Sequence, residues 1–525
     1  MSEGLYDLKK KYKFIVKRGA EANGVYYARK GAEEIRISRP MQWVSLDRNV
    51  MMNLHAWRFF SGMWFSLFSL PSWEKFSDIL GFIVDWSEHE KNKKHAMLWY
   101  DMATGIRACH LSLLLEVERV LGYGFGDHKD IIVDLCDRHV LHLADKKNIT
   151  QGNHALHQVI GLTLLSESMG IEDNKDFCSS FINGWVSSAF DENYVNVENS
   201  PYYQRYNVNI ISNIPSGLGG VKYEEISRVK VRGKELLPWM TDPHGNFYKI
   251  GATEGQGVES RPRKWSGRYI VDDKKWLLKD LYSSGYQFLR EVKGYGSHFV
   301  FLGKNKSYTH AHEDSLSFLF YSQGICLLDD SGKYTYNLDE WRSYFISDHA
   351  HNNAGLKGVA CFPRDVGVEK EGGVCHLRPA TINDEDFVFE GSVVKWEGTF
   401  FHRRKVLIKN NGLKVVVDDW LVNLTEDKSE IRYHFGKGVT LKELEDGKWG
   451  CFYKSKTESR VASVSFDKID VDVEIVEGRE KPSIQGWISE KYGEKTPAQV
   501  MLLHARPGVF CLTTTFEIKA FCDEA

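Results

Sequence analysis

The sequence predicts a two-domain α+β protein in which a helical half is followed by a β-rich half. Between about residues 57 and 190 the apolar residues recur at helical spacing, and Gly122, Gly124 and Gly170 separate the segments. After about residue 280 the segments become short, rich in β-branched and aromatic residues, and bounded by Gly, Asn and Asp. A chain of 525 residues is also too long for one ordinary core, which favours two domains.

Segments such as WEKFSDILGFIVDW, DIIVDLCDRHVLHL and HALHQVIGLTLLSES follow one another with short polar joints and no strand pattern between them. This succession predicts antiparallel helical hairpins. Such hairpins pack as a bundle, a solenoid or a closed α/α toroid, and periodicity alone does not separate the three.

The β-rich half begins after a Gly-rich and then basic joint, KIGATEGQGVESRPRKWSG, which places the boundary between about Gly251 and Asp280. We therefore predict domains at residues 1–265 and 266–525. Within the second, Asn411-Gly412 between two apolar runs predicts a two-residue hairpin turn, because a type I′ turn needs positive φ at both central residues.

Composition excludes several classes of function. A net charge of −3 provides no positive field for nucleic acid or an anionic membrane, so neither is an expected partner. Nine Cys without a C-x-x-C pair argue against a zinc ribbon and a full disulfide framework. The start, MSEGLYDLKKKYKF, has no apolar signal region, and no window has the length of a spanning helix. We expect a soluble protein that is cytoplasmic or, if a signal peptide was removed, periplasmic or secreted.

The densest polar cluster in the sequence is YTHAHEDSLSF, where His310, His312 and Asp314 alternate and would share one face of a strand. Asp330 ends the following apolar strand, and His351 lies in SDHAHNNAG. A His, Asp, His set from neighbouring strands suits zinc or a similar ion. The alternative is a hydrogen-bonded polar network that orients the sheet.

Two segments of the helical half also carry polar groups. Asn153 and His154 stand at the start of a helix, whose free N–H groups favour a carboxylate ligand, although Asn153 could also be an N-cap. The segment ENSPYYQRY predicts an ordered loop with Tyr202, Tyr203 and Arg205. Phenols beside an Arg can act as acid and base, and the alternative is amphipathic packing.

These elements occur in a distinctive order: N-H at a helix start, S-P-Y-Y-Q-R-Y, H-x-H-x-D, D-x-G-x-Y-x-Y, and Y-F-x-S-x-x-x-H-N. Together, from about residue 99 to residue 352, they resemble the heparinase II/III-type polysaccharide lyases, and YYQRY is also similar to the oligoalginate lyases of the same architecture. The resemblance implies an N-terminal incomplete α/α toroid and a C-terminal antiparallel β-sandwich.

The resemblance also implies a reaction, β-elimination beside a uronic acid, which gives a 4,5-unsaturated uronate product. Asn153 and His154 match the positions that neutralise the uronate carboxylate. Tyr203 matches the phenol that protonates the leaving oxygen and in some members abstracts the proton, with Tyr202 as the adjacent alternative. His310 matches the catalytic histidine, which acts on the carboxylate or as the base.

Further positions follow from the same resemblance. His312, Asp330 and His351 match a structural zinc site, and Tyr344 matches a further substrate-binding tyrosine. Arg205 is a candidate cation for acidic substrate groups on the basis of its neighbourhood alone. Many members have His where this chain has Gln204.

The expected partner is an acidic polysaccharide or oligosaccharide, with a glycosaminoglycan favoured over alginate or a bacterial capsular polymer. Whether the protein forms a homodimer, and whether it cleaves within the polymer or from one end, stays open. A glycoside hydrolase on an α/α toroid is the first alternative and would use two carboxylates. Its candidates are Glu198, Asp314 and Asp101. A glycan-binding protein without activity is the second alternative.

Overall fold

The computed structural model divides into two compact units, and each is described separately. One consists of Met1–Ala189 with Asn209–Lys230, and the other of Phe190–Val208 with Val231–Ala525. The predicted boundary at residues 265 and 266 lies outside the described residues. The structure describes residues 3–17, 24–28, 33–254, 269–271, 274–292, 296–304, 307, 309–363, 374–383, 386–409, 412–445, 447–454, 458–467 and 471–519.

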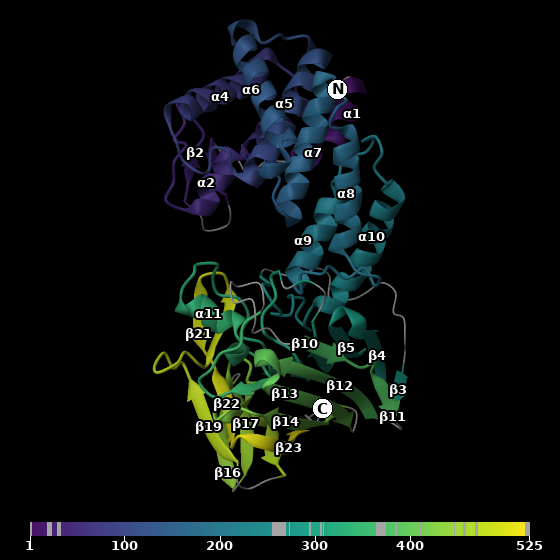
Figure 1. The fold of residues 1–525 in the computed structure, drawn as a ribbon, viewed down its shortest axis with the longest axis vertical. Coiled ribbons are helices and arrows are strands. Elements are labelled where there is room, and N and C mark those ends of the chain that lie inside the picture. Colours follow the sequence, from purple (N-terminus) through teal and green to yellow (C-terminus); the bar gives the residue numbers. More distant parts are fainter. Residues whose placement is uncertain are drawn as a thin grey trace. The chain divides into compact units, whose positions relative to one another are not determined.

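The first unit is helical, and its helices succeed one another as the periodicity predicted (Figure 1). Helices α9 and α10 begin in one unit and end in the other. No helix in the described part of the chain is both long and apolar enough to cross a membrane. The helices are α1 Glu3–Lys11, α2 Arg48–His55, α3 Phe60–Ser69, α4 Trp73–Asn92, α5 Asp101–Leu121, α6 Lys129–Ala144, α7 Gly152–Met169, α8 Lys175–Ala189, α9 Pro201–Ser212 and α10 Tyr223–Leu236.

Helices α5 and α7 approach closely through two glycines. A Cβ on Gly105 would lie 2.5 Å from the carbonyl oxygen of His157, and one on Gly161 would lie 2.2 Å from the carbonyl oxygen of Gly105. Neither contact is sterically allowed, so glycine is required at both positions. This contact holds the second turn of α5 against the second and third turns of α7.

The second unit is built from antiparallel sheets, as the sequence predicted. The largest has the order β10-β12-β13-β14-β23-β18-β17-β16 with β11 on β12, a second has β3-β4-β5-β6-β7-β8, and a third has β19-β22-β15-β9. One short helix, α11 Glu340–Ile346, precedes β9. The strands are β3 Tyr269–Val271, β4 Lys274–Leu281, β5 Tyr286–Glu291, β6 His298–Leu302, β7 Phe318–Ser322, β8 Ile325–Leu328, β9 Ala354–Leu356, β10 Val374–Leu377, β11 Thr381–Asn383, β12 Asp386–Lys395, β13 Phe400–Lys409, β14 Lys414–Asn423, β15 Ser429–His434, β16 Val439–Glu445, β17 Lys448–Lys454, β18 Glu458–Phe466, β19 Asp472–Glu477, β20 Trp487–Lys491, β21 Glu494–Pro497, β22 Gln499–Ala505 and β23 Gly508–Ile518.

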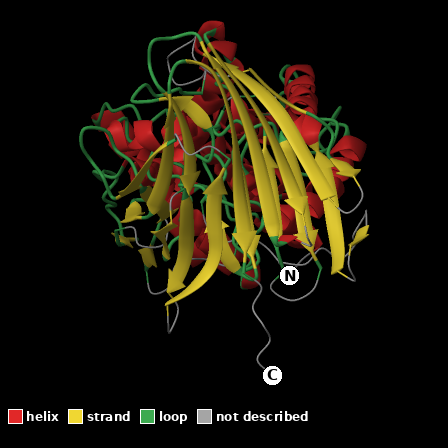
Figure 2. Ribbon diagram, turned by 90° about the horizontal axis from the view of Figure 1, so that it is seen from below, coloured by secondary structure: helices red, strands yellow, loops and turns green. Residues whose placement is uncertain are grey.

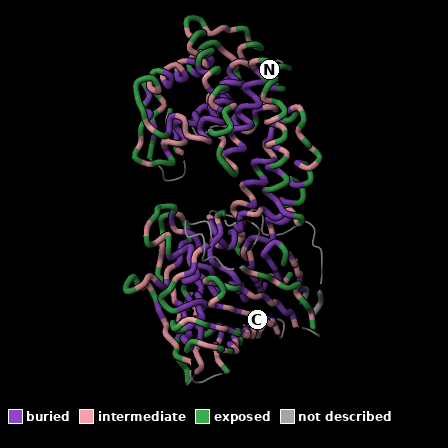
Figure 3. The backbone as a smooth tube through the Cα atoms, in the orientation of Figure 1, coloured by how far each residue is buried: buried purple, intermediate pink, exposed green. Residues whose placement is uncertain are grey.

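Burial differs between these sheets for a physical reason. Along β13 buried and less buried residues alternate, because one face packs on the core and the other is more accessible. Figure 2 shows the strands of this unit in yellow, and Figure 3 colours the backbone by burial. Strands β6 and β7 are buried at every position. Their second face is covered by an apolar cluster that includes Trp239, Phe247 and Tyr248 from the segment after α10. Strands β6 and β7 are therefore enclosed on both faces, which makes them a rigid base for the loop that joins them.

Two local predictions need correction. The β13–β14 hairpin forms, but its last pair is Lys409 with Lys414, so its loop has more than two residues; Gly412 has φ +79° and Asn411 lies outside the described residues. The segment ENSPYYQRY was predicted to be a loop, yet α9 begins at Pro201. Ser200 precedes it, and Pro at the first helical position is a common helix start, which explains the difference.

Candidate functional site

His310 lies in an irregular loop between β6 and β7, and the predicted strand around it is wrong. Its φ of +59° is in the left-handed region, so the alternating spacing does not place His310 and His312 on one face. The His310 carbonyl accepts the N–H of Ala252 at 2.9 Å. A Cβ at Gly251 would come within 2.8 Å of the same oxygen, so glycine there permits the loop to pack closely.

The His310 ring contacts Tyr203 and Glu198. The Tyr203 and His310 rings stack with centroids 3.6 Å apart and planes 11° apart. The Nδ1 of His310 lies 2.7 Å from Oε2 of Glu198, whose other oxygen accepts Asn207 Nδ2 at 3.1 Å. The carboxylate therefore fixes both the orientation of the imidazole and the nitrogen that faces it.

A second phenol extends this cluster. The hydroxyls of Tyr203 and Tyr336 are 2.9 Å apart, and Tyr336 is 40% exposed. The ammonium of Lys333 lies 3.6 Å from the centroid of the Tyr336 ring and 3.2 Å from Glu254. Tyr336 is the last residue of the D-x-G-x-Y-x-Y motif, and no sequence pattern assigns a role to Tyr336, Lys333 or Glu254.

Burial determines the protonation of this cluster. Burial, with Tyr336 and Glu198 nearby, raises the pKa of Tyr203 well above its ordinary range. Burial likewise raises the pKa of Tyr336, and it lowers the pKa of Lys333 to about 8 against the opposing effect of Glu254. At neutral pH both phenols therefore keep their protons, which suits a proton donor.

The helical unit contains a second carboxylate–histidine pair. Asp101 is the first residue of α5 and His154 lies in the first turn of α7; the Nδ1 of His154 is 3.1 Å from each Asp101 oxygen. Burial would raise the pKa of Asp101, but the hydrogen bonds of His154 and the Met102 N–H hold it below its ordinary value. The carboxylate is therefore ionised at neutral pH.

Asn153 also lies in the first turn of α7, as the sequence indicated. The N-cap position is occupied by Gln151, so the alternative interpretation of Asn153 as the N-cap is wrong. Asn153 and His154 are both partly exposed on the same helix start. Their role in binding a carboxylate stays a prediction.

His312, Asp330 and His351 come together in the second unit, separate from the partners of His310. One ligand atom of each lies within 4.8 Å of the others, and all three residues are buried. Asp330 Oδ2 is 2.7 Å from His351 Nδ1, while His312 Nδ1 and His351 Nε2 are buried and have no hydrogen-bond partner among the described residues. Burial, with His351 nearby, lowers the pKa of His312, so that its imidazole is neutral. Two unpartnered nitrogens beside a carboxylate fit a zinc ion.

The remaining predicted substrate-binding residues differ in their surroundings. Arg205 and Tyr202 are partly exposed, and the Arg205 guanidinium lies 4.9 Å from the Phe247 ring centroid. Tyr344 is 5% exposed, lies in an apolar cluster with Phe345, and has its pKa raised to about 12 by burial. These are the surroundings of a core residue, and the substrate-binding role of Tyr344 stays a prediction. The side chain of Gln204 is held by three main-chain hydrogen bonds, since it accepts the Asn196 N–H and donates to the carbonyls of Tyr194 and Gly233. Its role is therefore to hold these segments together.

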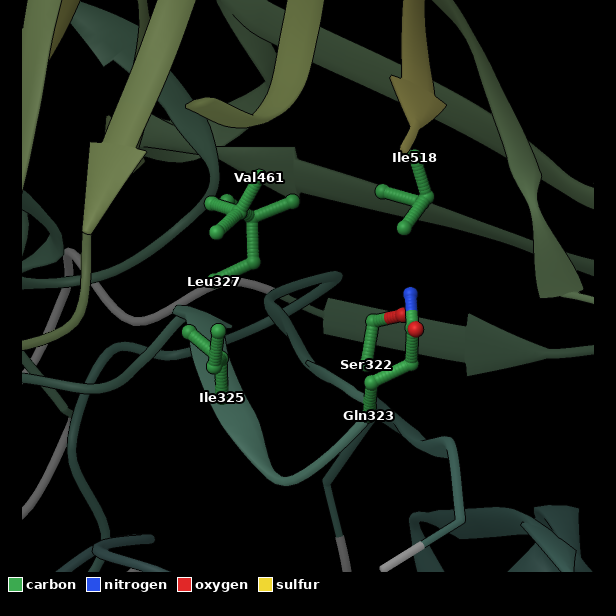
Figure 4. A pocket seen from close by; sticks show the side chains of 6 residues that line it. All are labelled: Ser322, Gln323, Ile325, Leu327, Val461 and Ile518. Carbon is green, nitrogen blue, oxygen red and sulfur yellow. The ribbon is translucent and has the colours of Figure 1, made fainter. Parts of the chain in front are cut away.

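The three carboxylates considered for a glycoside hydrolase each face a basic group. Glu198 faces His310, Asp101 faces His154, and Asp314 is 3.6 Å from the buried ammonium of Lys304. The small pocket in Figure 4 is lined by residues without an ionisable side chain, so it offers no acid or base. Its lining is Ser322, Gln323, Ile325, Leu327, Val461 and Ile518.

The β-rich part of the chain is similar to a known protein family. Residues 273–518 match the family model described as heparinase II/III-like, C-terminal. This region is similar to the C-terminal domain of that family. No curated protein sequence matches the chain.

The fold of the chain, helices followed by antiparallel sheets, is similar to that of heparinase III structures. A heparinase III structure is 14% identical with a TM-score of 0.66, covering 100% of this chain and 86% of that one. The heparan sulfate lyase HepC from Pedobacter heparinus is 12% identical with a TM-score of 0.63, covering 99% and 84%. A heparinase III gene product with methylated lysines is 13% identical with a TM-score of 0.67, covering 99% and 85%. Identities this low show a common fold alone.

Proposed function

We propose that the chain is a polysaccharide lyase that cleaves a uronate-containing polysaccharide by β-elimination and releases a 4,5-unsaturated uronate. The observation that carries the proposal is the Tyr203–His310–Glu198 cluster, in which a protonated phenol stacks on an imidazole fixed by a carboxylate. The similarity to the heparinase II/III-like C-terminal domain supports the same reaction class. A glycosaminoglycan is the favoured substrate, with alginate oligosaccharides and bacterial uronate polymers as alternatives.

The proposed roles divide the proton transfers between two side chains. When the proton of His310 is on Nδ1 and is donated to Glu198, Nε2 keeps a lone pair that can accept the C5 proton. The C5–H electrons then form the C4=C5 bond, and the bond from C4 to the glycosidic oxygen breaks. Tyr203 donates its proton to that leaving oxygen. Its raised pKa supports the acid role over the base role that the resemblance left open.

Removal of the C5 proton also needs stabilisation of the charge that develops on the uronate carboxylate. Hydrogen-bond donors held in place before the reaction supply this most effectively, because they need no reorganisation in the transition state. Asn153 and His154 are the proposed donors. The ionised Asp101 supports this role because it orients the His154 ring.

Zinc bound by His312, Asp330 and His351 is a further part of the proposal, as a structural ion that takes no part in proton transfer. His312→Ala should lower zinc content by one equivalent per chain and lower the melting temperature of the second unit by about 5 °C or more. His349→Ala is the control, because His349 is also buried but offers no ligand to this set. Elemental analysis that finds no metal in the wild-type protein would refute the zinc site.

The reaction class is tested by incubating the protein with hyaluronan, chondroitin sulfate, heparan sulfate, heparosan, alginate and bacterial uronate polymers. Ultraviolet absorbance of the unsaturated product is followed together with new reducing ends. A lyase gives both in equal amounts. New reducing ends without the absorbance would identify a hydrolase, and neither product on any polymer would favour a glycan-binding protein.

A further inference from the structure

A second histidine cluster lies in the helical unit, remote in sequence from the candidate catalytic residues. His55 ends α2, His89 lies in the last turn of α4, and His95 lies in the connection from α4 to α5. One ring nitrogen of each lies within 4.8 Å of the others. We propose that these three imidazoles bind a divalent transition-metal ion of the zinc type, with water in the fourth position.

The spacing of two of these nitrogens fits tetrahedral coordination. Zinc–nitrogen bonds of about 2.0–2.1 Å at the tetrahedral angle place two ligand nitrogens about 3.3–3.4 Å apart. The Nε2 atoms of His89 and His95 are 3.4 Å apart. This distance is long for a hydrogen bond between them and matches a shared ion.

The third ligand is fully buried and lacks a partner at the relevant atom. His55 is 0% exposed, and its Nε2 has no hydrogen-bond partner in the described structure. Burial also lowers the pKa of His55 to about 3, and burial lowers the pKa of His89 and His95. All three rings are therefore neutral at physiological pH, and neutral imidazole is the form that binds metal.

Two neighbouring groups oppose the ion. The indole N–H of Trp86 donates to His55 Nδ1 at 3.1 Å, which puts the His55 proton on Nε2, the atom that would bind the metal. Coordination therefore requires the other tautomer and the loss of this bond. One neutral hydrogen bond is a small loss against coordination by three imidazoles. The buried Arg107 guanidinium, which bonds the His55 carbonyl, is the second opposing group.

Negative charge from α4 favours a cation beside His89. Asp85 precedes His89 by one helical turn, and its electrostatic influence acts on the His89 imidazole. Asp85 also accepts the indole N–H of Trp43, whose ring lies over His55 with centroids 6.1 Å apart. Since His89 and His95 are partly exposed, water can reach the fourth position. The bound ion would link α2, α4 and the start of the connection to α5.

Metal content of the full chain tests the proposal. We expect the His89→Gln/His95→Gln variant to hold one equivalent less zinc than the wild type after dialysis against zinc-containing buffer. His142→Gln is the control, because His142 is partly exposed on the neighbouring α6 and lies outside the cluster. It should hold as much zinc as the wild type. The proposal is distinct from the zinc site of the second unit, whose loss in His312→Ala should leave this equivalent in place.

Cobalt and tryptophan spectra give a second measurement. Co²⁺ refilling should give the visible absorption of a four-coordinate site that is lost in His95→Gln, and binding should change the emission of Trp86. Trp86→Phe removes the competing N–H and should tighten metal binding by about fivefold to tenfold. Equal metal content and equal cobalt spectra in the wild type and the double variant, with both folded by circular dichroism, would overturn the site.

Discussion

The two units each fix a histidine with a carboxylate, but they place it in different surroundings. In the second unit, one oxygen of Glu198 lies 2.7 Å from Nδ1 of His310, and the imidazole stacks on the Tyr203 phenol. In the helical unit, both oxygens of Asp101 lie 3.1 Å from Nδ1 of His154 at a helix start. The shared contact leaves Nε2 of each ring available to a substrate.

The difference lies in what accompanies each ring. His310 has two protonated phenols nearby, so proton transfer is the chemistry that its surroundings support. His154 has the free N–H groups of a helix start, which favour a negatively charged group. A carboxylate–histidine pair alone therefore does not define a role, and the two pairs should respond differently when each is changed.

The largest effect is expected from Tyr203→Phe, which removes the proposed acid. Loss of a general acid typically costs about 10²–10⁴-fold, and we expect the upper part of this range in kcat with polymer binding retained. Tyr202→Phe is the matched control, since the adjacent phenol lies outside the His310 stack; it should change kcat by about threefold or less. Near-normal turnover of Tyr203→Phe would contradict the assigned acid.

A smaller loss, about 10²-fold in kcat, is expected from Glu198→Gln. The amide can still face His310 but cannot stabilise the imidazolium that forms when Nε2 accepts a proton. KM should stay within about threefold, because the loss arises in the transition state. Asn207→Ala removes only the second partner of Glu198 and should cost less than about tenfold. Equal losses in both variants would show that the carboxylate acts through folding.

Several candidate residues of the site could be named from the sequence, but the carboxylate–histidine contacts between them could not. Tyr203, His310 and the His312, Asp330, His351 set were named from motif order. Glu198 and His310 are 112 residues apart in the chain, and Asp101 and His154 are 53 apart. Local spacing cannot reveal such contacts, because they depend on how distant elements pack. From the sequence, Asp101 was named only as a candidate carboxylate of a glycoside hydrolase, and its contact with His154 appears only in the structure.

The order of helices and strands was predictable because hydrophobic periodicity is a local property. The failures were local as well, and each has a backbone cause. The alternation of His310 and His312 predicted a strand, yet His310 adopts positive φ, which non-glycine residues rarely do. Pro201 was a missed helix-start signal in ENSPYY.

A third experiment separates binding from proton transfer in the helical unit. Asp101→Asn should lower kcat/KM about tenfold, with part of the loss in KM and part in kcat, because a disoriented His154 binds the uronate carboxylate less tightly and stabilises less of the charge that develops on it. Asp130→Asn is the control, since Asp130 also lies in the first turn of a helix, α6, but has exposed surroundings. A fall in kcat as large as that of Glu198→Gln would mean that the two pairs have the same role.

The smallest effect concerns stability against acid. The folded-state pKa of Asp101 lies below its ordinary value of 3.8, so its contribution is present above that pH and is lost as pH falls through the folded-state pKa. Asp101→Asn should therefore lower the free energy of unfolding of the helical unit at pH 6 by about 0.5–1 kcal/mol and have a smaller effect near pH 3. Urea unfolding followed by tryptophan emission measures the difference. If the difference in free energy of unfolding between the variant and the wild type instead grew as the pH fell, the lowered pKa of Asp101 would be contradicted. Such a result would mean that the carboxylate binds protons more tightly in the folded state than in the unfolded state.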